Sequence, residues 1–184
     1  MAAPTVEETK TMKTLVDQLA KYATYHRDRR NIATHLIGIP MIVVSIAILL
    51  SRPGVDVAGV LLTPALVLTG ATVLYYFLLD LRFGLVMAAL MALSLWAGYT
   101  VAAQSTTVWL GTGIGMFVVG WVFQLVGHVY EGKKPAFVDD LTGLIIGPLF
   151  VMAELGFAMG LRAEVEHQIE ETAGPIRSLK PQSA

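Results

Sequence analysis

The sequence contains no cysteine among its 184 residues. This excludes disulfide bonds, thiolate nucleophiles, iron–sulfur clusters and zinc sites with cysteine ligands. Charged residues are also scarce, at 15%, against about 25% in a typical soluble domain. The formal net charge is -1, so the chain lacks the basic surplus of a nucleic-acid-binding protein, and we expect no nucleic-acid partner.

Apolar residues are present in excess: they make up 55% of the chain and give a mean hydropathy of +0.64. Several apolar runs approach the roughly 20 residues that a helix needs to cross a bilayer. We therefore expect an all-α fold, a polytopic membrane helix bundle in a single domain over residues 1–184. An amphipathic interfacial helix is expected at 10–26, with an ordinary surface helix packed on the bundle as the alternative; the bundle is expected at 32–161 and a polar tail at 162–184.

Five apolar stretches make up the expected bundle. Four of them are expected to span the membrane, at 32–50, 57–79, 83–103 and 108–127. The fifth, at 141–161, contains Gly147-Pro148, and we expect it to be broken there into a re-entrant hairpin or two short helices. The alternative is a full span, which would place the tail outside. Small residues along the fourth stretch have a spacing that permits close helix contact; they are Gly111, Gly113, Gly115 and Gly120.

The lysines and arginines predict the orientation. A cytoplasmic N-terminus places most basic residues of the flanks and loops inside and leaves Arg52 outside. It also places the candidate site described next on the cytoplasmic side. The short polar start and the lack of a retention signal favour a bacterial inner membrane. Membrane lipids are the expected surroundings, and the sequence leaves a homo-oligomer open.

Three histidines occur where apolar stretches meet the cytoplasmic side, namely His26, His35 and His128. Glu131 follows His128 by three residues, which places both on one face of a helix. His26 and His35 are nine residues apart and converge only if the helix breaks between them, and Asn31 is a good N-cap for such a restart. We therefore predict that these histidines and Glu131 form one metal site with a catalytic role, in which Glu131 either binds the metal or supports a residue that does.

Imidazole and carboxylate ligands suit iron(II), zinc or manganese. With iron(II), open coordination positions would take O₂ and a chelating substrate; with zinc, they would hold a water activated for hydrolysis. A zinc-dependent membrane lipid hydrolase therefore stays open, as does b-type haem between His35 and His128. Four histidines in all are too few for the multi-histidine diiron sites of membrane desaturases. A transporter or scaffold is disfavoured because the second and third stretches hold few polar residues.

Four further polar residues are assigned to the substrate or to the surroundings of the metal. Asn31 is a candidate donor that orients a histidine, with simple helix capping as the alternative. Glu154 is the one acid well inside an apolar stretch, so we expect it to pair with a histidine, an arginine or the metal. Arg30 and Lys134 would attract an anionic headgroup or a substrate carboxylate, although positive-inside signalling alone also accounts for them.

Three motifs carry a resemblance that covers about residues 10–165. They are Tyr25-His26 with Asn31, His35 and Gly38-Ile39-Pro40; Gln124-Leu125-Val126-Gly127-His128 with Glu131-Gly132 and Pro135-Ala136; and Gly147-Pro148-Leu149-Phe150 with Glu154. Together they resemble the small membrane 2-hydroxy fatty acid dioxygenase family. The basic stretch Asp28-Arg29-Arg30 departs from the Asn/Pro-rich spacer of that family.

The resemblance implies an iron(II)-dependent α-oxidation, in which a 2-hydroxy fatty acid reacts with O₂ and leaves a fatty acid one carbon shorter. His26, His35 and His128 match the family's histidines, and Glu131 and Asn31 match motif positions. The substrate's carboxylate and hydroxyl would chelate the iron while its acyl chain stays among the helices. The expected cofactor is therefore Fe(2+), and the expected partners are a lipid substrate and O₂.

Overall fold

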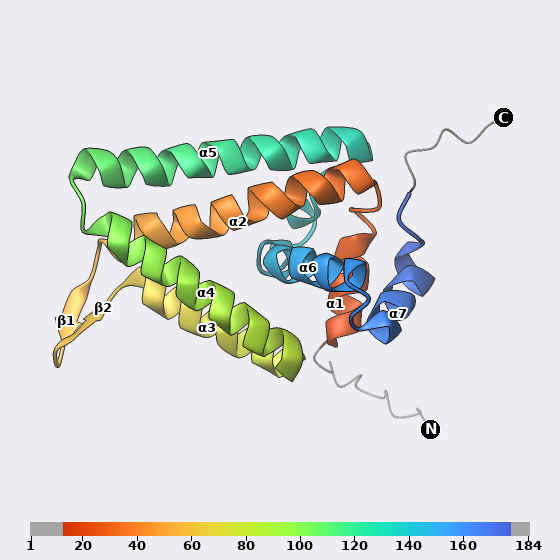
Figure 1. Ribbon diagram of the computed structural model, residues 1–184, viewed down its shortest axis with the longest axis horizontal. Coiled ribbons are helices and arrows are strands. Elements are labelled where there is room, and N and C mark those ends of the chain that lie inside the picture. The colour runs from red at the N-terminus through yellow and green to blue at the C-terminus, as the bar shows by residue number, and fades with distance from the viewer. Residues whose placement is uncertain (1–12, 178–184) are drawn as a thin grey trace, which may run out of the picture.

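The computed structural model describes residues 13–177 and is predominantly helical (Figure 1). Positions 10–12 of the expected interfacial helix and 178–184 of the expected tail lie outside the described residues. The elements in chain order are α1 (Leu15–Ala23), α2 (Arg29–Ser51), β1 (Val55–Val57), β2 (Val60–Leu62), α3 (Pro64–Leu79), α4 (Leu81–Ala102), α5 (Thr106–Glu131), η1 (Ala136–Val138), α6 (Gly143–Ala158) and α7 (Ala163–Ala173).

Helix α2 is the centre of the arrangement. It lies beside α5 along its length and also contacts α3, α4 and α6. The pair α3 and α4 diverges from α2 and α5, and α6 lies in the angle between the two pairs (Figure 1). Helices α1 and α7 cover the end where α2 begins and α5 ends, and the β1–β2 hairpin lies at the opposite end (Figure 1).

Helices α2, α4 and α5 are long and apolar enough to cross a membrane, with hydropathies of 2.3, 1.8 and 1.6 over their most apolar windows. Their outer faces remain exposed and apolar; Trp96 is 65% exposed and Val122 is 54% exposed. Large exposed apolar surfaces of this kind are unusual in soluble monomers and fit contact with lipid. The expectation of a helical membrane protein is therefore supported in outline.

The expected second span at 57–79 is wrong at its start, because residues 55–62 form an antiparallel hairpin instead. Ala58 and Gly59 both have positive φ at its turn. Helix α3 begins only at Pro64, after the Thr63 hydroxyl caps it by accepting from Leu66 N–H at 3.1 Å. Proline is favoured at this first position because it lacks an N–H group. The remaining 16 residues give a helix of about 24 Å, shorter than the roughly 30 Å hydrocarbon core.

The fifth stretch is bent, but the bend does not occur at Gly147-Pro148 as expected. Helix α6 continues through Pro148, and the chain turns by 116° between α6 and α7. Two residues with positive φ, Gly160 and Arg162, make this turn. The expected polar tail thus contains a helix, α7, which packs against α1.

Helix α1 lies within the expected interfacial segment. Its apolar face is buried, with Leu19 and Ala23 both 0% exposed, and it contacts α6 and α7. Thr14 and Asp17 form a capping box at its start, which fixes where the helix begins. The apolar side is therefore covered by protein, so α1 behaves as a surface helix of the bundle.

Glycines allow α2 and α5 to approach closely. A Cβ at Gly120 would lie 2.8 Å from Ile42 Cγ1 and 2.9 Å from the Gly38 carbonyl oxygen. Gly113 likewise faces α2, whereas Gly111 and Gly115 face open space. Two of the four glycines predicted to allow close contact therefore do so, and the contact fixes the histidine of α5 against that of α2.

Candidate metal centre

Three histidines from separate segments meet at the end of the α2–α5 pair. His26 lies in the loop before α2, His35 on the second turn of α2 and His128 on the last turn of α5. His26 and His35 are 0% exposed and His128 is 8% exposed. One ligand atom from each lies within 4.8 Å of the other two, and the ring centroids are 4.6 to 5.0 Å apart.

Backbone carbonyls set the tautomers of two rings. Nδ1–H of His26 donates to the Tyr22 carbonyl at 2.8 Å, and Nδ1–H of His35 donates to the Asn31 carbonyl at 2.9 Å. The two Nε2 atoms then carry lone pairs and face each other at 3.1 Å. Two nitrogens bound to one ion at about 2.1 Å would lie roughly 3.0–3.4 Å apart, so this spacing fits a shared metal.

The third ring also offers an unused nitrogen. Nδ1 of His128 is buried and has no hydrogen-bond partner among residues 13–177. Burial, together with the neighbouring His35 ring, holds the pKa of His26 well below its usual value. A neutral imidazole is the form that binds metal, so the geometry and the protonation state both favour an ion here.

The loop that carries His26 ends one helical turn earlier than expected. Asp28, rather than Asn31, is the N-cap of α2, and its carboxylate accepts from Arg30 N–H at 2.8 Å. The Arg30 guanidinium also pairs with this carboxylate at 2.9 Å and lowers the pKa of Asp28 to about 2. Both residue types are good N-caps, and the sequence pattern did not distinguish them.

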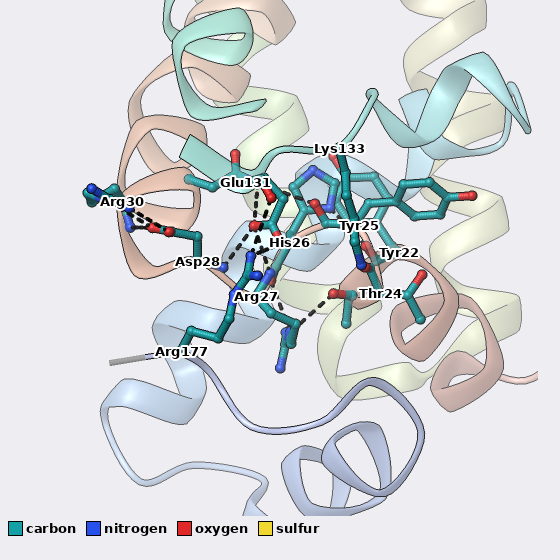
Figure 2. Close-up of polar contacts among 12 residues, drawn as sticks. Tyr22, Thr24, Tyr25, His26, Arg27, Asp28, Arg30, Glu131, Lys133 and Arg177 are labelled. Carbon is teal, nitrogen blue, oxygen red and sulfur yellow. Dashed lines mark hydrogen bonds and ion pairs between the residues drawn. The ribbon is translucent and has the colours of Figure 1, made fainter. Parts of the chain in front are cut away.

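Glu131 links the end of α5 to the loop before α2 by hydrogen bonds (Figure 2). Its Oε2 accepts from the backbone N–H groups of Arg27 and Asp28 at 3.0 and 2.8 Å, and from Nδ2 of Asn31 at 3.1 Å. Its Oε1 accepts from the guanidinium of Arg177. The cluster of ligand atoms within the described chain consists of the three histidines and does not include Glu131.

A buried ion pair lies beside the site. Arg27 donates to Glu154 at 2.9 Å, with side chains 7% and 6% exposed. The same guanidinium donates to the carbonyls of Ala23 and His26. The partner of Glu154 is thus an arginine, one of the three alternatives expected, and the pair holds the His26 loop against α6.

Arg30 and Lys134 are directed to the surface. Arg30 pairs with Asp28 and lies over the Tyr130 ring at 4.6 Å. Lys134 pairs with Asp139 at 2.6 Å, and its side chain is 58% exposed. Neither is brought into the histidine cluster, so their contacts favour a role at the protein surface over direct substrate binding.

Several residues of the site were not singled out from the sequence. The Tyr22 ring stacks on His26, with centroids 4.1 Å apart and planes 3° apart; the available signal was that Tyr22 precedes His26 by four residues. A Cβ at Gly127 would press on Asn31 and lie 3.0 Å from His35 Nδ1. Arg177 lies in the tail, where no pattern in the sequence marks it.

An apolar cavity of about 290 Å³ reaches the cluster from inside the bundle. It lies between α2, α5, η1 and the first half of α6, and His128 is part of its wall. The site is therefore a buried three-nitrogen centre with an apolar space on one side.

Comparison with known proteins decides the family. A family model described as "2-hydroxy-palmitic acid dioxygenase Mpo1-like" matches residues 12–159. The chain belongs to the Mpo1-like family. It is 33% identical over 162 residues to the 2-hydroxy-palmitic acid dioxygenase MPO1 of Saccharomyces cerevisiae. The aligned region covers 85% of this chain and 90% of that protein. No solved structure matches the chain.

The resemblance drawn from the three motifs is thus confirmed. The part matched by the Mpo1-like model contains the three histidines, Glu131 and Glu154, whereas Arg177 lies beyond it. The contact between Arg177 and Glu131 therefore joins the tail to the family's matched region.

Proposed function

We propose that this Mpo1-like protein is an iron(II)-dependent dioxygenase that shortens 2-hydroxy fatty acids by one carbon. The observation that carries the proposal is the convergence of His26, His35 and His128 on one buried point. The names of the matching family and of the yeast relative supply the substrate class and the use of O₂.

The donor set fits iron(II). Three imidazoles suit this ion and leave coordination positions free for a substrate. Iron(II), when bound here, would supply the one-electron chemistry that allows O₂ to react with an organic acid. The carbonyls of Tyr22 and Asn31 keep the metal-facing nitrogens of His26 and His35 unprotonated, a task that such outer partners commonly perform.

The overall reaction balances without another reductant. One 2-hydroxy acid and one O₂ give a carboxylic acid one carbon shorter, one CO₂ and one water. The bond between the carboxyl carbon and the hydroxyl-bearing carbon breaks, and the hydroxyl-bearing carbon becomes the new carboxyl group. The burial of the histidines keeps bulk water from the reacting head of the substrate, and the apolar cavity accepts its acyl chain.

We assign Glu131 a positioning role. Its carboxylate oxygens are occupied by three N–H donors and a guanidinium, so it holds the loop that presents His26. The proposed membrane orientation follows from the basic residues near this end, among them Arg29, Lys133 and Lys134, which favour the cytoplasmic side.

The geometry disfavours b-type haem. The rings of His35 and His128 lie 5.0 Å apart, edge to face, and both contact His26. A porphyrin plane does not fit between two rings in this arrangement. A zinc-dependent hydrolase uses the same three-histidine set, and it is the alternative that the experiment below separates.

The test measures metal content and O₂ uptake of the detergent-purified protein, loaded anaerobically with Fe²⁺. We expect one iron per chain, O₂ uptake only with 2-hydroxy acids, and matched formation of CO₂ and the shortened acid. A fatty acid of equal length without the hydroxyl is the substrate control.

His128→Ala is expected to lose iron and turnover, whereas His167→Ala is expected to keep both. His167 is a suitable control because its side chain is 75% exposed, on α7. Stoichiometric zinc with ester or amide hydrolysis and no O₂ uptake would overturn the dioxygenase in favour of the hydrolase. Full iron and turnover in His128→Ala would refute the proposed site.

A further inference from the structure

The wall of the cavity beside the histidines is polar only near the metal centre. Apart from His128, the polar side chains that line it are Tyr22 and Gln124. The rest of the wall is apolar, with Ile42, Phe117 and Trp121 among its residues. Such a space suits a molecule with one polar end and a long apolar remainder.

Gln124 is placed to bind that polar end. It lies four residues, about one helical turn, before His128 on α5, so both side chains lie on the same face. It is 6% exposed, and its Nε2 has no hydrogen-bond partner among residues 13–177. A Cβ at Gly38 would lie 2.6 Å from this nitrogen, so the missing side chain at Gly38 makes room for the amide.

A buried donor without a partner destabilises the folded state, because it has lost its hydrogen bond to water and gained none in return. The buried side-chain atoms without a partner in residues 13–177 all lie at this site, namely Asn31 Oδ1, Gln124 Nε2 and His128 Nδ1, whereas the carboxylate of Glu131 has four donors. An unpaired amide in the wall of a cavity, one helical turn from His128, is therefore best explained by a ligand that accepts from it.

We propose that Gln124 is a substrate-binding residue whose Nε2–H donates to the carboxylate of the 2-hydroxy acid, with the acyl chain lying in the cavity. The inference rests on the proposed function for the identity of the substrate. A hydrogen bond to an anionic acceptor is stronger than one to a neutral group. Among residues 13–177, no lysine or arginine lines the cavity, which leaves the amide and the proposed metal to hold the carboxylate.

The far end of the cavity determines which chain lengths fit. Four residues, Val43, Ile46, Leu144 and Pro148, line both this cavity and a second one of about 340 Å³ between α2, α3 and α6. A long acyl chain passes these residues, whereas a short one ends before them. Ile46 is partly buried, so a larger side chain there narrows the passage without filling the core.

The first test compares Gln124→Leu with Gln18→Leu. Both replace a buried amide, but Nε2 of Gln18 donates to the Tyr75 hydroxyl at 2.9 Å. Without substrate, Gln124→Leu should keep or raise the melting temperature, because it removes an unpaired donor, whereas Gln18→Leu should lower it. Gln124→Leu should retain iron and raise the KM for the 2-hydroxy acid about 10- to 100-fold, as expected for loss of a hydrogen bond to a charged group.

Gln124→Glu sharpens this test, because a carboxylate of the same shape would repel the substrate and raise KM further. Thermal shifts of the iron-free protein with a 2-hydroxy acid separate binding from turnover: the wild type should be stabilised and Gln124→Leu should not. If the wild type turns over but Gln124→Leu has an unchanged KM and a lowered melting temperature, Gln124 is only structural. Absence of O₂ uptake by the wild type would instead refute the proposed function.

Ile46→Phe tests the path of the acyl chain. We expect its kcat/KM to fall for a long-chain 2-hydroxy acid and to stay near the wild-type value for a medium-chain one. The melting temperature and iron content serve as controls for folding. An equal change for both acids would refute the path past Ile46.

Discussion

Replacing Gly127 with alanine is expected to disturb the cluster of three histidines by adding one methyl group. A Cβ at this position would press on the side chains of Asn31 and Thr34 and lie 3.0 Å from Nδ1 of His35. Asn31 cannot retreat freely, because its amide donates to Glu131 at 3.1 Å. The methyl group must therefore displace either the Asn31 side chain or the end of α5 that carries His128.

The expected change in the stability of Gly127→Ala follows from two opposing effects. Overpacking costs about 1–3 kcal/mol, whereas alanine in a helix is about 1 kcal/mol more favourable than glycine. Gly111 lies on the same helix, and a Cβ there would meet no neighbouring atom within 4 Å, so Gly111→Ala experiences only the second effect. The difference between the two variants is thus about 1–3 kcal/mol, or roughly 2–12 °C in melting temperature for a chain of this size.

The assay is thermal unfolding in detergent, together with iron titration and O₂ uptake. Gly111→Ala should match or exceed the wild type in all three. Gly127→Ala should melt lower and bind iron about 10- to 100-fold more weakly, as is typical when residues around metal ligands are changed. Equal melting temperatures and equal iron affinity for the two variants would refute the view that close packing at Gly127 sets the geometry of the site.

Three further predictions concern the charged residues around the histidines. Glu131→Gln should lower the melting temperature and weaken iron binding about 10- to 100-fold. Glu171 is the control, because its side chain is 65% exposed, and Glu171→Gln should change neither property. An unaltered iron affinity in Glu131→Gln would refute the positioning role of Glu131. Glu154→Leu should destabilise the protein by about 3–5 kcal/mol because it leaves the buried charge of Arg27 without its carboxylate partner, and adding Arg27→Met should recover much of the loss. Additive losses would contradict this. The pKa of Asp28 is lowered to about 2, so its charged form stabilises the fold above the unfolded pKa of about 3.9. This contribution should be lost as the pH falls towards 2 and should be missing in Asp28→Asn, as chemical unfolding at several pH values would reveal.

The sequence located the three histidines because each lies where an apolar stretch ends. Helices that cross the same layer bring their ends together, so His35 and His128 were expected at one end of the bundle. The convergence of His26 required a break in the helix, and the break was expected. Its position was not, since Asp28 and Asn31 are both good caps and only the packed structure selects between them.

Other features depend on contacts between distant segments and could not be predicted. The apolar residues before Pro64 suit a membrane helix as well as a hairpin, because valine and leucine satisfy both patterns. The carboxylate of Glu131 suits a metal as well as N–H donors, and only the structure shows which donors reach it. Location in a bacterial inner membrane, the orientation and the oligomeric state stay predictions.

The hydrogen bond between Arg177 and Glu131 has a consequence for how the protein is made. A ribosome completes the histidines first and adds Arg177 46 residues after Glu131. The hydrogen bond from Arg177 to Glu131, which helps to hold the loop of His26, therefore forms only after the apolar helices α2 to α6 have been synthesised and can insert. Metal loading in the cell should accordingly follow the synthesis of Arg177.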